Sequence, residues 1–218
     1  MTGNFVFFEV MTESFRTISA PASASFRELG SRFLSFAFPV RDEHEIAQAL
    51  SDLSRRFPDA THHCFAWSLG AAGERWRAWD DGEPAHSAGD PILGQIRSAG
   101  LTQVLVVVVR YFGGTKLGVS GLVQAYRSAA RQALESATVI ETDVTERWII
   151  TYPWKEMQRV MSYVKSVEAA VEEMTTGESC RLIISVGVRH RFDQHLHAWA
   201  ERGIPVAAAR SDEHRDSI

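Results

Sequence analysis

One segment of the chain restricts its possible folds more than any other: residues 104–130, VLVVVVRYFGGTKLGVSGLVQAYRSAA. Residues 104–109 form a continuous, mostly β-branched apolar run, which is typical of a strand covered on both faces. A glycine-rich turn follows, and from Ser120 or Gly121 to about Ala137 small and apolar side chains recur at helical spacing. We therefore expect a central strand, a tight turn and a helix that packs closely on the sheet.

The turn between this strand and helix is the first candidate site. It contains Gly113, Gly114 and Gly118, with Arg110 before it and Lys116 inside it. Backbone N–H groups at a glycine turn and at a helix N-terminus form an electropositive concavity, and neighbouring cations add to its attraction for phosphate. Alternatively, the glycines only permit positive φ angles, with Lys116 in solvent. The turn is not a Walker A loop, because no glycine directly precedes Lys116 and no serine or threonine follows it, so ATP hydrolysis is not expected.

The charge distribution limits the possible partners. The formal net charge of −4 argues against a protein that coats nucleic acid or an anionic membrane with its whole surface, since that needs a broad basic field. Residues 91–134 nevertheless contain cations and no carboxylate. Aromatic side chains beside cations hold single-stranded RNA by stacking. The pattern predicts an RNA-binding face built from Arg110, Tyr111, Lys116, Arg127 and Arg131. We do not expect the protein to recognise DNA sequences.

A second candidate site is the loop Asp80-Asp81-Gly82-Glu83-Pro84. Its carboxylates could hold a hard divalent cation or perform acid–base chemistry. They could instead form a solvated turn that caps the following helix. In a third interpretation, Glu83 or Asp81 pairs with Arg110 or Lys116 across the end of the sheet and holds the loop in place.

The segment His62-His63-Cys64 contains residue types that bind metals. Neighbouring strand residues point to opposite faces, so only His62 and Cys64 could share an ion, with His86 as a third ligand. Cys64 could alternatively act as a nucleophile with His62 or His86, although nothing marks an orienting third group. We expect His62 to be at most part of the carboxylate-loop site, and we expect no metal, no cofactor and no catalytic residue.

The rest of the chain predicts an α+β protein with two domains. In the first half, strands are expected at 32–40, 61–69 and 75–79, and helices at 42–57 and 90–99, the second with Asp90 as its N-cap. The pattern restarts near residue 140, with strands at 148–152, 169–174 and 182–188, helices from Pro153 and from about Arg191 to Gly203, and a short strand at 204–208. This βαββα order, with a closing β, is a ferredoxin-like arrangement. The expected parts are an extension (1–14), a first domain (15–139), a second domain (140–208) and a disordered charged tail (209–218).

The cellular location is inferred from cysteine usage and hydropathy. Cys64 and Cys180 are far apart in the sequence, which fits a reducing compartment without a disulfide. The apolar residues 4–10 are too short and lack the basic segment of a secretory signal, and no run approaches the roughly 20 apolar residues that span a bilayer. We expect a cytoplasmic protein with no membrane partner.

Four segments, in their order and spacing, resemble the IMPACT/YigZ family: SRF (31–33), ATHHCFAW (60–67), DDGEP followed by PIL (80–93) and VVVRYFGGTKLGVSGLVQAY (107–126). RYFGG and KLG after an apolar strand form the family's signature, and the resemblance covers roughly residues 15–205. It implies that the first domain has the fold of domain 2 of ribosomal protein S-five, shared with domain IV of elongation factor G. It also implies that the second domain resembles domain V of that factor.

These features predict an RNA- or ribosome-associated binding protein that holds phosphate on the glycine turn and the adjoining helix, and the resemblance implies a regulator of translation. The alternative is an enzyme that acts on a phosphorylated or peptide substrate through residues 80–83. A third possibility is a regulatory protein partner on the exposed sheet face of the second domain. Convergence of Asp81 or Glu83 with Lys116 in a closed pocket would favour the enzyme, whereas cations on an open face would favour RNA binding.

Overall fold

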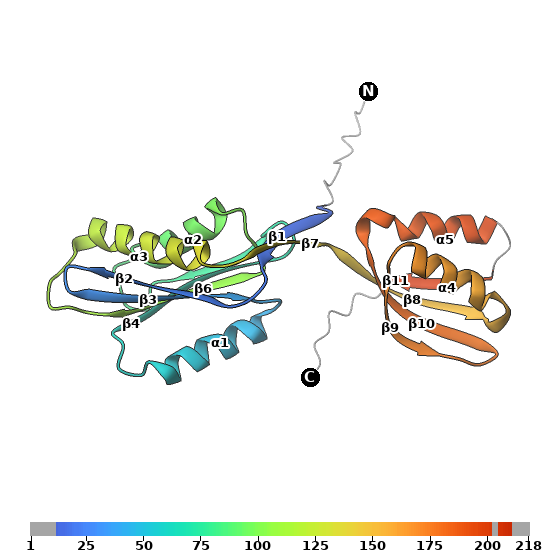
Figure 1. Ribbon diagram of the computed structural model, residues 1–218, viewed down its shortest axis with the longest axis horizontal. Coiled ribbons are helices and arrows are strands. Elements are labelled where there is room, and N and C mark those ends of the chain that lie inside the picture. The colour runs from blue at the N-terminus through green and yellow to red at the C-terminus, as the bar shows by residue number, and fades with distance from the viewer. Residues whose placement is uncertain (1–11, 202–204, 211–218) are drawn as a thin grey trace, which may run out of the picture. The chain divides into compact units, whose positions relative to one another are not determined.

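The computed structural model describes residues 12–201 and 205–210; the rest of the predicted extension and tail lies outside the described residues. The chain divides into two compact units (Figure 1). The first spans Ser14–Thr142, and the second contains the described residues from Asp143 onward together with Thr12 and Glu13. The boundary therefore falls between Thr142 and Asp143, close to the 139/140 boundary expected from the sequence.

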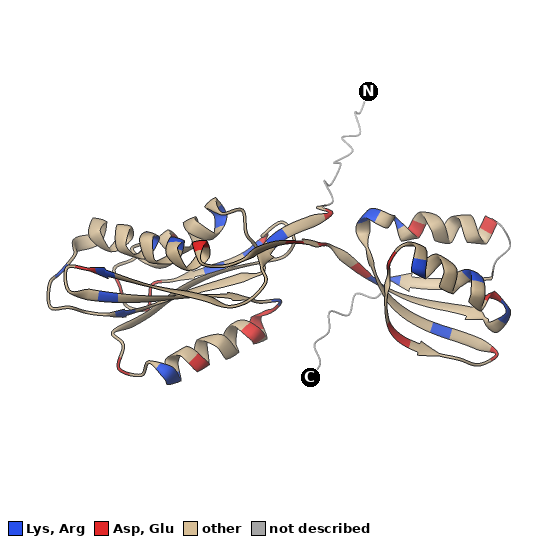
Figure 2. Cartoon of the chain, viewed as in Figure 1, with Lys and Arg blue, Asp and Glu red and all other residues tan. Residues whose placement is uncertain are grey.

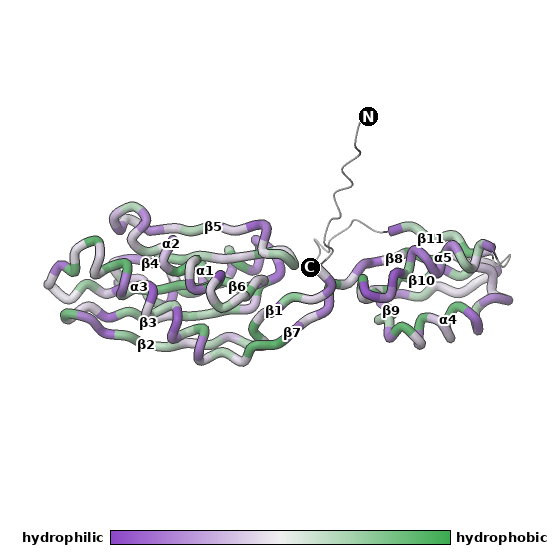
Figure 3. The backbone as a smooth tube through the Cα atoms, turned by 90° about the horizontal axis from the view of Figure 1, so that it is seen from above, coloured by the Kyte–Doolittle hydropathy of each residue, from purple (hydrophilic) through white to green (hydrophobic). Residues whose placement is uncertain are grey.

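The first unit is built on a five-stranded antiparallel sheet with the strand order β2-β3-β6-β4-β5. Its strands are β2 (Ala22–Glu28), β3 (Ser31–Pro39), β4 (His62–Leu69), β5 (Arg75–Trp79) and β6 (Val104–Tyr111). The central strand β6 is buried from Val104 to Arg110, because helices cover the sheet on both faces (Figure 1). The expected central strand is confirmed, and β2 and β5 form the two edges of the sheet (Figure 3).

Three helices cover this sheet. Helices α2 (Gly89–Ser98) and α3 (Gly118–Glu135) lie on one face, and α1 (Glu43–Arg56) lies on the other (Figure 1). Helix α1 begins as predicted, because the Asp42 side chain accepts a hydrogen bond from the backbone N–H of Glu45. Small residues on the inner side of α3 allow the close packing that the sequence predicts. Helix α2 begins before Asp90, so the predicted N-cap at that residue is wrong and Asp90 lies in the first turn.

Two strands near the start of the chain are absent from the sequence interpretation. Strand β1 (Ser14–Ile18) pairs with β7 (Val139–Asp143) in a small two-stranded sheet, and β2 forms an edge of the large one. Since Ser14 begins β1, the predicted extension ends too late. The alternation A-S-A-S-F in residues 22–26 was the available signal for β2, because period-two alternation is typical of a strand with one face buried.

The second unit contains a four-stranded sheet with the order β11-β8-β10-β9. Its elements are β8 (Thr145–Pro153), η1 (Trp154–Glu156), α4 (Met157–Ser166), β9 (Ala170–Thr175), β10 (Ser179–Gly187), η2 (Val188–His190), α5 (Phe192–Glu201) and β11 (Ala207–Arg210). Apart from the two single 3₁₀ turns, this is the predicted order of strands and helices. One core joins α4 and α5 to the sheet and includes Trp148, Phe192 and Trp199. Because β11 extends to Arg210, the predicted tail begins too early, and the predicted helix end at Gly203 lies outside the described residues.

Two further observations concern the cysteines and the helices. Cys64 and Cys180 are both free and buried, each in the core of a different unit. Within the described ranges, no helix combines the length and the apolar character that crossing a bilayer requires.

Candidate functional site

The glycine turn, residues 112–117, connects the end of β6 to α3. Gly113 lies against the turn between β2 and β3, since a Cβ atom on it would sit 1.9 Å from the carbonyl carbon of Gly30 and 2.2 Å from its oxygen. Gly114 and Gly118 have φ angles of +88° and +70°, and nothing lies within 4 Å of where their Cβ atoms would be. Gly113 is therefore required by a close backbone approach, and the other two by backbone conformation.

Lys116 and most of its turn are exposed to solvent. In the described chain, no side chain caps the N-terminus of α3, and no carboxylate lies within ion-pair distance of Lys116. The first N–H groups of a helix have no partner inside the helix. Within the turn, the backbone N–H groups of Phe112 and Gly113 already donate to the hydroxyls of Thr61 and Ser31, at 3.0 and 3.2 Å. What faces solvent, as an anion site requires, is therefore Lys116 and the exposed first turn of α3.

Arg110 does not belong to this exposed surface. Its side chain is 5% exposed, and Nη1 donates a hydrogen bond to Oε1 of Glu83 at 2.5 Å. Nη2 donates to the hydroxyl of Ser31 at 3.3 Å, and the guanidinium lies 5.5 Å from the centre of the Phe33 ring and 5.6 Å from that of Phe112. The structure thus corrects the expected phosphate contact at Arg110, because a buried guanidinium already paired with a carboxylate cannot reach a phosphate in solvent. It confirms the alternative in which Glu83 pairs with Arg110 across the end of the sheet.

Glu83 is the centre of a buried polar cluster. Its Oε1 also accepts a hydrogen bond from the hydroxyl of Tyr126 at 2.7 Å, and the thiol of Cys64 lies 3.3 Å from that hydroxyl. Burial raises the pKa of the Cys64 thiol, and the nearby carboxylates of Glu83, Asp81 and Asp80 raise it further. Burial also raises the pKa of the Tyr126 hydroxyl, and Cys64 and Glu83 add to this shift. Cys64 is therefore held as a neutral thiol, which argues against a nucleophilic role.

The other carboxylates of the loop organise their own surroundings. The Asp80 side chain accepts hydrogen bonds at 2.8–2.9 Å from three backbone N–H groups, those of His86, Ala88 and Gly89. The Asp81 carboxylate accepts one from the backbone N–H of His63 at 2.6 Å, and Nδ1 of His62 lies 2.8 Å from the Asp81 carbonyl oxygen. Asp80 thereby supports the start of α2, as the helix-capping interpretation expects. No group of three His, Cys, Asp or Glu residues suited to a metal ion occurs in the described part of the chain.

The remaining predicted RNA contacts lie on two sides of the sheet. Tyr111 packs with the core on the α1 side, and its hydroxyl donates a hydrogen bond to Asp59 at 3.1 Å. Arg127 and Arg131 lie about one turn apart on the exposed side of α3, which covers the opposite face. The structure therefore does not bring Tyr111, Arg127 and Arg131 together in one face.

Two cations that the sequence interpretation missed lie beside Tyr111. Arg27 of β2 is directly opposite Arg32 of β3, and Arg32 is directly opposite Tyr111 of β6. Both arginines are exposed, and among the described residues neither has a carboxylate within ion-pair distance. Figure 2 shows Lys and Arg positions at this end of β2 and β3. We call Arg27, Arg32 and Tyr111 the arginine row; it was not predictable without β2 and its register.

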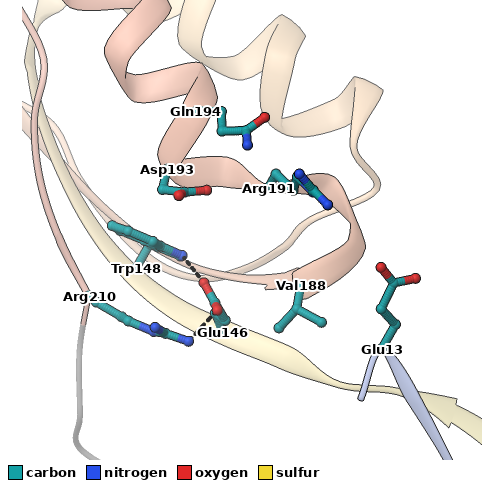
Figure 4. A pocket seen from close by; sticks show the side chains of 8 residues that line it. All are labelled: Glu13, Glu146, Trp148, Val188, Arg191, Asp193, Gln194 and Arg210. Atoms are coloured by element: carbon teal, nitrogen blue, oxygen red, sulfur yellow. Dashed lines mark hydrogen bonds and ion pairs between the residues drawn. The ribbon is translucent and has the colours of Figure 1, made fainter. Parts of the chain in front are cut away.

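The second unit contains a separate cavity of about 300 Å³, and Figure 4 labels its lining residues. Its walls carry both charges: Glu146 pairs with Arg210 and accepts a hydrogen bond from Nε1 of Trp148 at 3.1 Å, and Arg191 and Asp193 lie at the start of α5. None of the candidate site residues predicted from the sequence lines this cavity. The mixed charge favours no particular ligand.

Comparison with known proteins places these features in a family. Residues 29–134 match the Impact N-terminal domain. The chain is 38% identical over 154 residues to an IMPACT family member of Thermus thermophilus, covering 71% of this chain and 83% of that protein. It is 40% identical over 138 residues to the IMPACT family member YigZ of Escherichia coli, covering 62% and 67%. A solved structure described as a hypothetical protein has a similar fold, with a TM-score of 0.70 at 23% identity, over 93% of this chain and 99% of that one. The chain belongs to the IMPACT family.

Proposed function

We propose that this protein binds RNA, free or in the ribosome, and regulates translation from the cytoplasm. The observation that carries the proposal is the arginine row, where Arg27 and Arg32 face each other on neighbouring strands without a carboxylate partner in the described chain. Like charges directly opposite each other destabilise a sheet. A phosphate placed between the two guanidinium groups removes this repulsion and gains charge-assisted hydrogen bonds.

The surroundings of the arginine row suit a nucleic acid strand. Tyr111 continues the row on β6 and offers an aromatic ring beside the cations. Lys116 follows on the glycine turn, with the uncapped N-terminus of α3 next to it. Arg127 lies exposed on the other side of the sheet, as does Arg131, which pairs with Glu135 at 3.8 Å. A single RNA contacts both sides only by passing around the end of the sheet.

The proposal includes the resemblance of the two domains to parts of translation factors. The element order of the second unit, β8-α4-β9-β10-α5-β11, supports a ferredoxin-like domain akin to domain V of elongation factor G. The match of residues 29–134 to the Impact N-terminal domain supports the expected likeness of the first unit to domain 2 of ribosomal protein S-five. Such likeness concerns the fold, so binding must be tested directly.

The carboxylate loop does not favour the enzyme alternative. Glu83 is buried and paired with Arg110, whereas Lys116 is exposed, so the two do not form a closed pocket with a free acid and a free cation. The hydrogen bonds of Asp80 and Asp81 hold the loop in place. The three carboxylates of the loop therefore have structural partners, and none of them needs a catalytic role to account for its position.

The test is binding of fluorescein-labelled single-stranded RNA, a structured RNA and ribosomal subunits across a salt series. The double variant Arg27→Ala/Arg32→Ala should weaken binding to single-stranded RNA and reduce the salt slope by about 0.7 for each phosphate that the protein no longer neutralises. Lys116→Ala should reduce the salt slope by about 0.7, the value for one phosphate. Lys165→Ala, which removes an exposed cation of α4 in the second unit, is the matched control. Equal affinity and slope in the double variant and the control would refute the arginine row as the RNA site.

A further inference from the structure

Strand β5 (Arg75–Trp79) is an open edge of the large sheet. It pairs with β4 on one side, and no other strand among the described residues pairs with its outer side. The backbone N–H and C=O groups along that outer side can therefore pair with another extended segment. We propose that β5 is a docking edge, on which an acidic, extended segment of a partner protein adds as a further strand. This interaction goes beyond RNA binding and uses a different surface.

The aromatic side chains of β5 provide the apolar part of this surface. Trp76 is 51% exposed and Trp79 is 47% exposed. The guanidinium of Arg97, in the last turn of α2, lies 4.6 Å from the centre of the Trp76 ring, and that of Arg77 lies 5.6 Å from the Trp79 ring. These contacts hold the rings in place before a partner arrives, which reduces the entropy lost on binding. Tryptophan and arginine are the residue types that most often dominate the energy of protein interfaces.

The charge of this edge calls for an acidic partner. Arg77 and Arg97 have no carboxylate within ion-pair distance in the described part of the chain. The carboxylate of Glu43 pairs with Arg75, and that of Asp81 accepts hydrogen bonds from the backbone N–H of His63 and from Nε1 of Trp79. Arg77 lies on the α1 side of the sheet and Arg97 on the α2 side. Since side chains of an added strand alternate between the two sides, an acidic segment can place a carboxylate beside each arginine.

A second copy of this chain is a poor occupant of the edge. The strand reads Arg75-Trp76-Arg77-Ala78-Trp79, so antiparallel pairing of two copies about their centres places Arg77 opposite Arg77. Like charges in that position destabilise the pair. Charged side chains commonly protect edge strands from self-association in this way, and here the same charges attract an acidic strand.

A single strand of RNA also fits this edge less well than a peptide. Trp76 and Trp79 are three residues apart in a strand, so their rings lie on opposite sides of the sheet. One nucleic acid strand following one side can stack on one of the two rings. A peptide that pairs with the edge contacts both sides and also uses the open backbone groups.

The test measures fluorescence anisotropy of labelled peptides of about eight residues added to the full chain. The first probe, the Glu-Val peptide, repeats Glu-Glu-Val-Val, so that Glu lies on both sides of the added strand. A second has Lys in place of Glu. A third is the Glu-Val peptide N-methylated at every residue, which removes the N–H donors of both of its edges. We expect micromolar binding of the first, and at least about tenfold weaker binding of the other two. Binding of the first and third peptides with equal affinity would overturn strand addition.

Variants of the chain locate the site. Arg77→Glu/Arg97→Glu should weaken binding of the Glu-Val peptide at least about tenfold, and Trp79→Ala should do so to a similar extent. Lys165→Glu, the matched charge reversal on α4, should bind as the unmodified chain does. Circular dichroism verifies the fold of each variant, and the exposed arginine pair remains informative if Trp79→Ala unfolds. Equal binding by the arginine double variant and the control, or no binding up to about 1 mM peptide, would overturn the proposal.

RNA serves as the competing occupant in the same assay. Labelled oligouridylate should retain its affinity in Arg77→Glu/Arg97→Glu and lose it in Arg27→Glu/Arg32→Glu. Loss of RNA affinity in the first variant, with no effect on the peptide, would identify β5 as a nucleic acid site and overturn the peptide proposal. Failure of the arginine row and failure of the docking edge are therefore separate results.

Discussion

Replacing Glu83 by alanine tests the most constrained interaction in the first unit. The side chains of Glu83 and Arg110 are 4% and 5% exposed, and Arg110 would keep one hydrogen bond, to Ser31 at 3.3 Å. Tyr126 would lose its acceptor and keep Cys64 as a neighbour. Breaking a buried pair by removing one partner costs about 3–5 kcal/mol, because an uncompensated charge stays in the core. That is a large part of the stability of a typical domain, about 5–15 kcal/mol.

Native-state hydrogen exchange measures this loss in the first unit alone. Amides of β6 (Val104–Tyr111) should exchange faster in Glu83→Ala by a factor that corresponds to about 3–5 kcal/mol, while those of β10 in the second unit should not change. Glu135→Ala is the control, since its pair with Arg131 is exposed and spans 3.8 Å, and it should cost about 0.3–0.5 kcal/mol. In Glu83→Met/Arg110→Met most of the loss should be recovered, because no charge is left in the core. If Glu83→Ala costs no more than Glu135→Ala, our account of the polar cluster is refuted.

Three other predictions concern the turn, the thiol and the loop. Gly113→Ala should lower the free energy of unfolding by about 3 kcal/mol, because the new Cβ meets the Gly30 backbone. Gly114→Ala should lower it by about 1 kcal/mol, through backbone strain at positive φ. Thermal unfolding measures both losses, and a larger loss in Gly114→Ala would contradict the close approach at Gly113. Because burial raises the pKa of Cys64 above its unfolded value near 9.0, the stabilisation by the neutral thiol is complete below pH 9 and declines as the pH rises further. Between pH 8 and pH 10, the free energy of unfolding measured with urea should therefore fall more steeply in the unmodified chain than in Cys64→Ala, by up to about 1.4 kcal/mol per pH unit. Parallel pH dependences of the two proteins would contradict the raised pKa of Cys64. Asp80→Ala should lower stability by about 2 kcal/mol and speed exchange of the first α2 amides, with Asp80→Asn less affected; unchanged exchange would rule out the capping role.

Local patterns were sufficient to predict much of the fold. The β-branched run before the glycine turn identified the central strand, because such a run needs cover on both faces. Asp42 marked the start of α1, since a side-chain cap acts over three residues of sequence. The signature around Arg110 and Gly113 indicated the family, which the relatives of Thermus thermophilus and Escherichia coli confirm.

The candidate site depended on contacts between distant parts of the chain. In the sequence, Arg110 resembles a phosphate ligand because it precedes the glycine turn. Only the tertiary structure shows that its side chain is buried and paired with Glu83. Arg27 and Arg32 become a pair through the register of β2 on β3, and hydrogen bonding between strands sets that register. The sequence by itself determined most of the strands, helices and tight turns, because those follow from local periodicity and backbone preference; strands β1, β2 and β7 were not predicted. The tertiary structure alone decided which charges are buried and which face solvent, because burial depends on what packs across the sheet.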